Sequence, residues 1–203
     1  MSPKPKPPTN AGRRFEPTVL SPDEVNRLLA AIPARSSSGA RLRALVGVLY
    51  GAGLRLQEAL DLLPSDVKGC QITVRNGKGG RRRVVGIDQK SCALLDTWLL
   101  RRESLGLNGR QPIFSTFSVD ALGKPWDPRE ARRSLERAGA RAGLDRVHPH
   151  GLRHSHAVRV AGGGDVRVVQ RQLGHASLAT TTRYLDHLTA DDLVDALDAL
   201  GEW

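Results

Sequence analysis

The stretch His150-Gly151-Leu152-Arg153-His154 lies in the second half of the chain, and it is followed by Leu173-Gly174-His175 and by Tyr184. Two further phrases stand upstream of it, Gly53-Leu54-Arg55-Leu56-Gln57-Glu58 and Gly77-Lys78-Gly79-Gly80. Together these phrases supply guanidinium, imidazole, ammonium and phenol groups. A guanidinium fork matches phosphate oxygens, and phosphoryl transfer asks a protein mainly to position groups and stabilise charge. The combination therefore predicts transfer of a phosphoryl group to a tyrosine oxygen without a metal ion.

The composition indicates a basic globular protein. Its 203 residues are enough for one domain with a hydrophobic core, or for two small ones at most. The formal net charge of +10 favours a polyanionic partner, nucleic acid or an anionic membrane surface, over a basic surface kept only for solubility. No apolar run approaches the length of a membrane span and no signal peptide precedes the fold. We therefore expect a cytoplasmic protein that binds nucleic acid and no membrane.

Charge is distributed unevenly, and it divides the chain into an arm and a domain. Residues 1–15 are rich in proline and lysine without a periodic apolar pattern, so we expect a flexible arm there and a folded domain over residues 16–203. Residues 186–203 carry acidic side chains but no lysine or arginine, and an apolar stripe predicts a last helix at about 189–200. Residues 75–83 are basic, and we expect nucleic acid contacts from their arginines, Arg75, Arg81, Arg82 and Arg83.

Apolar periodicity predicts an α+β fold, mostly helical with one small antiparallel β-sheet. The first helix begins at Ser21, because Pro22 and Glu24 follow it in the pattern of a capping box. Alternating apolar residues predict strands near 72–74 and 84–87 around a glycine-rich turn, with 66–69 adding a first strand. Residues 104–126 are expected to form a loop. Further helices are expected near residues 40–51, 55–62, 88–102, 127–142, 151–161, 166–173 and 178–185.

Taken one at a time, the charged residues of these phrases have simpler explanations. Arg55 and Glu58 are three residues apart on one helical face, and taken alone this spacing favours a surface ion pair. Lys78 equally suits a solvated loop. His150 and His154 have the i, i+4 spacing of a zinc site, but no cysteine or glutamate ligand accompanies them in the sequence. Cys70 and Cys92 lack metal-type spacing, and we expect both to be reduced packing residues.

The two tyrosines of the chain stand in different surroundings. Tyr50 lies in an apolar run and is expected in the core, whereas Tyr184 lies among threonines, Arg183 and Asp186. An amphipathic helix residue with a solvated hydroxyl is the simpler explanation of Tyr184. For His175, which follows a glycine, the simpler explanation is a helix C-cap.

In their order along the chain, these motifs resemble the catalytic domain of the tyrosine recombinases, the phage-integrase and Xer-like family. The resemblance runs from about Leu20 to about Leu188 and includes the phrases YGAGLRLQEAL, HPHGLRHSHA and QLGHASLATTTRYLDH. It implies the fold of DNA breaking-rejoining enzymes.

The resemblance also implies a role for each motif residue. Tyr184 is the expected nucleophile, and Arg55 and Arg153 are expected to clamp the scissile phosphate. His150 is expected to assist proton removal, Lys78 to protonate the leaving 5′-oxygen, and His175 to donate a hydrogen bond to the phosphate. The implied activity is site-specific cutting and rejoining of double-stranded DNA through a 3′-phosphotyrosine, with no metal and no cofactor. The implied assembly is a tetrameric synapse of protomers on DNA.

One departure from the family and two other functions stay open. Family members usually carry a separate N-terminal helical domain, but only a basic, proline-rich segment of about 15 residues precedes the catalytic domain here, so the chain is a fragment or a minimal recombinase. Residues 166–184 also suit a helix-turn-helix, which would make the protein a DNA-binding regulator, although a regulator needs neither Arg55 nor Lys78. A type IB topoisomerase would share the chemistry without site specificity.

Overall fold

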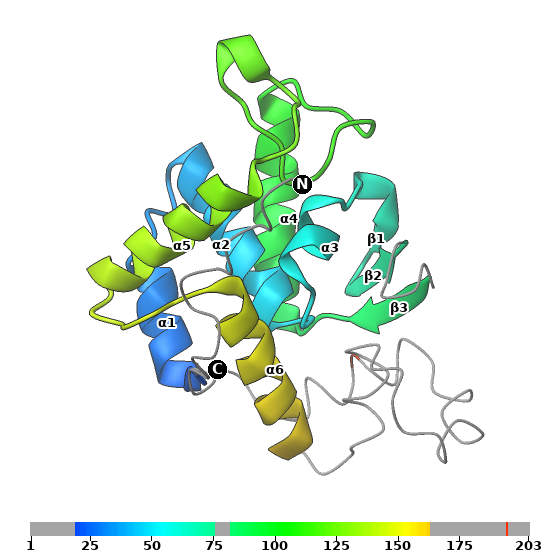
Figure 1. The fold of residues 1–203 in the computed structure, drawn as a ribbon. Coiled ribbons are helices and arrows are strands. Elements are labelled where there is room, and N and C mark those ends of the chain that lie inside the picture. The colour runs from blue at the N-terminus through cyan, green and yellow to red at the C-terminus, as the bar shows by residue number, and fades with distance from the viewer. Residues whose placement is uncertain (1–18, 76–81, 163–193, 195–203) are drawn as a thin grey trace, which may run out of the picture.

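The structure, a computed structural model, describes residues 19–75, 82–162 and 194. Within these ranges the chain forms helices around a buried centre and one small sheet at the side (Figure 1). The helices are α1 (Pro22–Ala30), α2 (Ser37–Tyr50), α3 (Leu56–Leu60), α4 (Gln89–Ser104), α5 (Pro128–Arg141) and α6 (Pro149–Gly162), with 3-10 turns η1 (Pro64–Asp66) and η2 (Val119–Ala121). The strands are β1 (Val67–Lys68), β2 (Gln71–Val74) and β3 (Arg83–Gly86).

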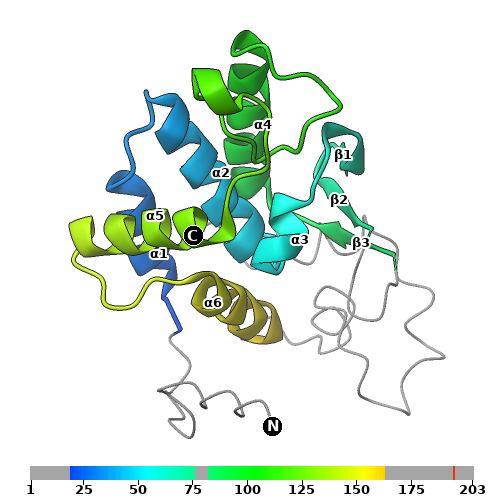
Figure 2. The same cartoon turned by 45° about the horizontal axis from the view of Figure 1, so that its top comes forward.

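Helix α2 forms the centre of the core because it is apolar on most of its faces. Its residues Leu45, Val46 and Leu49 are fully buried, and α4 packs along it. Gly47 permits the close approach, since a Cβ there would lie 3.2 Å from the Ser91 carbonyl oxygen. Helices α1 and α5 lie on one side of α2 and the sheet lies on the other, with α6 beside the end of α2 (Figures 1 and 2).

The sheet confirms the predicted change of period. Strands β1, β2 and β3 pair in that order, all antiparallel, with Ile72 opposite Val85 and Val74 opposite Arg83. Ile72 and Val74 are buried while their neighbours are half-buried, as alternation along a strand requires. The first strand expected within 66–69 is β1.

The predicted helix starts are confirmed by their caps. Ser21 and Glu24 form the capping box of α1, and Asp88 and Asp127 cap α4 and α5. Helix α2 begins earlier than expected because the Ser36 hydroxyl accepts a hydrogen bond from the Gly39 amide at 3.1 Å. Among the described residues, no helix has both the length and the apolar character of a membrane span. The expected arm, the turn 76–80 and the helices expected beyond residue 163 lie outside the described residues.

Candidate active site

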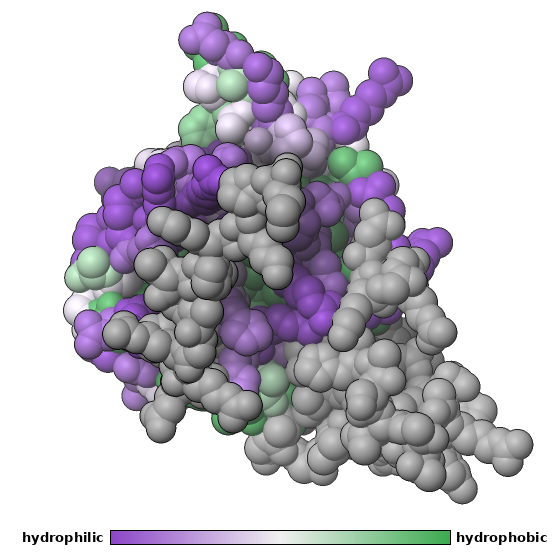
Figure 3. Space-filling model, in the orientation of Figure 1, coloured by the Kyte–Doolittle hydropathy of each residue, from purple (hydrophilic) through white to green (hydrophobic). Residues whose placement is uncertain are grey.

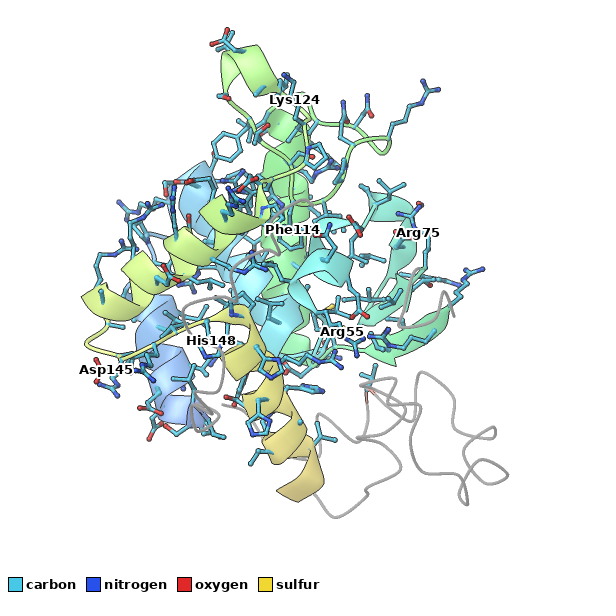
Figure 4. The ribbon with its side chains drawn as sticks, viewed as in Figure 1. Arg55, Arg75, Phe114, Lys124, Asp145 and His148 are labelled. Carbon is cyan, nitrogen blue, oxygen red and sulfur yellow. The ribbon has the colours of Figure 1, made fainter. Side chains whose placement is uncertain are left out.

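A hollow of about 340 Å³ opens between α3, α5 and the start of α6. It brings together three of the predicted residues, Arg55, His150 and Arg153, although about 100 residues of chain separate the first from the other two. Arg55 lies between α3 and α6, and His148 lies at the start of α6 (Figure 4). The described part of the face seen in Figure 3 is predominantly hydrophilic. The complete lining is Arg55, Leu56, Gln57, Arg132, His148, Pro149, His150 and Arg153.

Arg55 reaches this hollow because the chain breaks between α2 and α3. Gly53 has a φ of +66°, a left-handed conformation that favours glycine, and Arg55 then takes the N-cap position of α3. The Arg55 guanidinium donates to the Glu58 carboxylate at 2.8 Å, and the Arg55 backbone amide donates to the same group at 2.9 Å. Glu58 is only 8% exposed, so a simple surface ion pair is the wrong explanation of these two residues.

Glu58 is the centre of a cluster of arginines. Both terminal nitrogens of Arg83 donate to its carboxylate, at 3.0 and 2.8 Å, and the Arg153 guanidinium lies 3.9 Å away. Burial alone would raise the pKa of Glu58, but the hydrogen bonds from Arg83 and Arg55 and the charge of Arg83 outweigh it and lower the pKa to about 2. The carboxylate therefore stays ionised and fixes Arg55 and Arg83 in one geometry.

Arg153 is the most buried guanidinium in the hollow, at 6% exposure. It lies on the first turns of α6 and donates to the Gly53 carbonyl, so it joins α6 to the loop that precedes Arg55. Burial, followed by the positive charge of Arg55, lowers the pKa of Arg153 to about 10. Arg153 thus remains charged near neutral pH while little water surrounds it, which strengthens its attraction for an anion.

The two histidines at the start of α6 differ in what they can do. The Nδ1 atom of His148 accepts a hydrogen bond from the Gly151 amide at 2.9 Å, so this ring caps the helix. Burial and the nearby His150 lower the pKa of His148, which keeps its ring neutral. His150 is exposed, so its ring is accessible to a bound group. Within residues 19–75 and 82–162, no group of three or more histidine, cysteine or acidic side chains is arranged to hold a metal ion.

The predicted basic residues have different surroundings. Arg83 has a side-chain exposure of 13% and is committed to Glu58, whereas Arg82 is exposed. Arg75 pairs with Asp66 at 2.9 Å and lies on the sheet away from the hollow (Figure 4). Lys78, Arg81, His175 and Tyr184 lie outside the described residues, and their roles stay predictions.

One residue of this region, Arg132, and one contact, that of Arg83 with Glu58, were not found from the sequence. Arg132 lines the hollow from α5, where Ala131, Leu135 and Ala138 are buried and the arginines occupy the other face. That amphipathic pattern was a usable signal. For Arg83 the signal was the strand register, because directly opposed residues share a face and its partner Val74 is buried.

We expect replacement of Glu58 by glutamine to lower the free energy of unfolding by about 3 kcal/mol at pH 7, because it removes the buried carboxylate that Arg55, Arg83 and Arg153 surround. In the wild type, the pKa is about 2 in the folded protein against its usual 4.5, so this stabilisation is present above pH 4.5 and is lost as the pH falls toward 2. Urea unfolding at pH 7 and pH 3 measures both effects.

Glu130→Gln is the matched control for this prediction. Glu130 pairs with Arg133 at the same 2.8 Å, but its side chain is 48% exposed, so its loss should cost under about 1 kcal/mol with little pH dependence. Equal losses in the free energy of unfolding for the two substitutions would show that Glu58 does not hold the arginine cluster together.

The chain is similar to known proteins over most of its length. The model of the phage integrase family matches residues 18–191. The tyrosine recombinase XerD of Caulobacter vibrioides is 36% identical over 188 residues, which cover 90% of this chain and 61% of that protein. The chain thus spans about three fifths of the length of the curated relatives it matches.

Two solved structures extend the comparison. The crystal structure of the XerA recombinase has a TM-score of 0.69 and 35% identity, covering 94% of this chain and 67% of that one. The XerH site-specific recombinase, bound to its difH substrate in a pre-cleavage complex, has a TM-score of 0.65 and 29% identity, covering 87% and 52%. The mostly helical fold with a small antiparallel sheet, as predicted, is therefore the fold of recombinase catalytic domains.

Proposed function

The chain belongs to the phage integrase family, and from that premise we propose that it is a site-specific DNA recombinase. It cuts and rejoins double-stranded DNA through a covalent 3′-phosphotyrosine intermediate. The observation that carries the proposal is the convergence of Arg55, Arg153 and the exposed His150 on one hollow.

The charge of the arginine cluster around Glu58, beside the hollow, suits a phosphate in its transition state. The carboxylate of Glu58 and the guanidinium groups of Arg55, Arg83 and Arg153 leave a net charge of +2. Because Glu58 and the Gly53 carbonyl already hold Arg55 and Arg153, these forks need little reorganisation when negative charge develops on the phosphate oxygens. Fixed donors of this kind are usually the largest contribution to such catalysis.

The chemical step assigns one role to each remaining motif residue. The phenol oxygen of Tyr184 attacks the phosphorus, and the bond from phosphorus to the 5′-oxygen breaks. A phenol with a pKa near ~10 needs a base and nearby positive charge, which His150 and the arginines supply. Lys78 gives a proton to the departing 5′-oxygen, and His175 donates a hydrogen bond to the phosphate. Attack by a 5′-hydroxyl of the partner strand reverses the sequence, so rejoining needs no cofactor.

The partner is double-stranded DNA, and the net charge of +10 suits it. Exchange between two duplexes requires four strand cuts, and each protomer carries one Tyr184, so we propose that four protomers assemble on DNA. This function places the protein in the cytoplasm with its DNA.

Covalent capture of DNA tests the proposed function. The protein is incubated with a library of duplexes that have a randomised core and a nick close to it. Cleavage then releases a short fragment that diffuses away, so the covalent adduct accumulates. Slow-migrating adducts on a denaturing gel, enriched for one sequence and formed in excess chelator, are the expected result. Adducts without sequence enrichment would favour topoisomerase-like relaxation, and tight binding without any adduct would favour a regulator.

Arg132 is expected to contact a phosphate beside the scissile one, because it is exposed and lines the same hollow. Arg132→Ala should weaken DNA binding for all sequences and reduce the slope of log affinity against log salt by about 1. Lys124→Ala is the control, since Lys124 is also exposed but lies apart from Arg55 and His148, which line the hollow (Figure 4). A slope that changes equally in both variants would contradict the assignment.

A further inference from the structure

Behind Arg153, a second group of polar side chains, three of them buried and one half-buried, lies where α6 meets the end of α2 and the start of α4. This anchor cluster consists of Tyr50, Asp88, His156 and Arg159. His156 and Arg159 follow Arg153 on α6 by three and six residues, so all three lie along one side of the helix. None of the cluster belongs to the lining of the hollow.

His156 is fully buried and contacts the loop that carries Arg55. Its Nδ1 atom lies 2.7 Å from the Tyr50 carbonyl oxygen, which can only accept, so Nδ1 carries the proton. Burial, followed by the positive charge of Arg159, lowers the pKa of His156 to about 3, and the ring is neutral. Its Nε2 edge packs on Gly53, where a Cβ atom would lie 2.9 Å from Nε2 and 2.4 Å from Cδ2.

Gly53 therefore lies between His156 and the two arginines of the hollow. Its α-carbon packs on the His156 ring, its carbonyl accepts from Arg153, and the chain reaches Arg55 two residues later. The left-handed conformation and the contact with His156 both require a glycine at this position. A movement of the ring would thus move the carbonyl that holds Arg153.

Arg159 fixes the same helix from its other end. Its guanidinium donates to the Asp88 carboxylate at 2.7 Å and lies 4.9 Å from the centre of the Tyr50 ring. Asp88 also accepts from the Ser91 amide at 2.8 Å, so the pair connects α6 to the first turn of α4.

Stability alone does not explain the anchor cluster. Replacing a buried ion pair by apolar groups is often neutral or stabilising. Within the described residues, buried His156 Nε2 and Arg159 Nε and Nη1 have no hydrogen-bond partner, and each such atom costs free energy. The cluster instead provides directional contacts that fix α6 in one register against α2, α4 and the Gly53 loop.

We infer that the anchor cluster positions Arg153 and Arg55 for the scissile phosphate, with His156 acting through Gly53. The inference rests on the proposed function in that the arginines clamp a DNA phosphate. His156 touches no DNA and is a positioning residue, whose loss displaces the arginines without removing them.

The test compares three variants of α6 in the covalent capture assay at saturating DNA. His156→Leu removes the bond to the Tyr50 carbonyl and should slow adduct formation about 10- to 100-fold, the effect of a displacement of about 1 Å. Its Kd for DNA should change by under about twofold, because most contacts go to other phosphates. His156→Asn retains an N–H donor at the same place and should restore the rate to within about threefold of wild type.

Ser155→Ala is the matched control for a purely structural effect. Ser155 is buried on the same helix and bonds to the Leu20 amide at 2.7 Å and the Gly151 carbonyl at 2.9 Å, away from Gly53. Its loss should lower the melting temperature but leave the rate within about twofold. The inference is overturned if His156→Leu keeps the wild-type rate below its melting temperature, or if Ser155→Ala loses as much rate.

A second measurement separates this inference from the proposed function. Tungstate, a tetrahedral dianion, should raise the melting temperature by binding the hollow. The difference between this rise in the wild type and in Arg153→Ala measures the contribution of Arg153. His156→Leu should lose most of this contribution to the rise in melting temperature, and Ser155→Ala should keep it. If the wild type forms no adduct, the proposed function fails, but the tungstate comparison still tests the inference. The inference is wrong if His156→Leu retains the full rise in melting temperature.

Discussion

Replacement of Arg153 by alanine is expected to lower the rate of DNA cleavage by about 10³-fold or more, the size of effect seen when an arginine that stabilises a phosphoryl-transfer transition state is lost. Arg153 is 6% exposed, held by the Gly53 carbonyl and aligned beside Arg55. Its charge acts where water is scarce, so neither solvent nor a neighbouring side chain replaces it. The rate of covalent adduct formation at saturating DNA measures the effect.

Arg153→Lys separates the charge of this residue from its shape. A lysine keeps the positive charge but lacks the planar guanidinium, which can donate hydrogen bonds to the Gly53 carbonyl and to a phosphate oxygen at the same time. We expect it to recover only a small part of the rate, leaving a loss of roughly 10²-fold. Arg133→Ala, which removes an exposed arginine paired with Glu130 on α5, should leave the rate unchanged. A lysine variant with wild-type rate would show that Arg153 acts as a simple point charge.

Local signals in the sequence predicted the secondary structure well, because caps and strand alternation depend on residues close in the chain. The capping box at Ser21, the caps at Asp88 and Asp127, and strands β1, β2 and β3 were all expected. The burial of Tyr50 was also expected, and its exposure is 1%. The three-residue spacing of His150 and Arg153 correctly placed both on one helix start.

The interactions that hold the hollow together were not accessible to the same reasoning. Glu58 pairs with Arg83 across 25 residues of chain, and His156 reaches the Tyr50 carbonyl across 106. Such contacts depend on how α6 and the sheet pack against α3, and a single sequence contains no local signal for that packing. The pairing of Arg83 with Glu58 was therefore not expected, and the nucleic acid contact expected of Arg83 stays a prediction.

Tyr184 carries the largest expected effect of all, because without a nucleophile no covalent intermediate forms. Its assignment rests on the order of the motifs and on its polar surroundings in the sequence. The chain has only two tyrosines, and the other, Tyr50, is buried in the core. Tyr184→Phe should therefore abolish adduct formation, whereas Tyr50→Phe keeps the buried ring beneath Arg159 and should retain it.

The most direct test is identification of the residue that carries the DNA. Adducts trapped on the nicked library are digested with nuclease and protease, and the modified peptide is sequenced by mass spectrometry. The proposed function predicts a nucleotide 3′-phosphate on the Tyr184 oxygen in the wild type and in Tyr50→Phe, and no modified peptide in Tyr184→Phe. A 3′-phosphate on any other residue, or an adduct that survives in Tyr184→Phe, would contradict it.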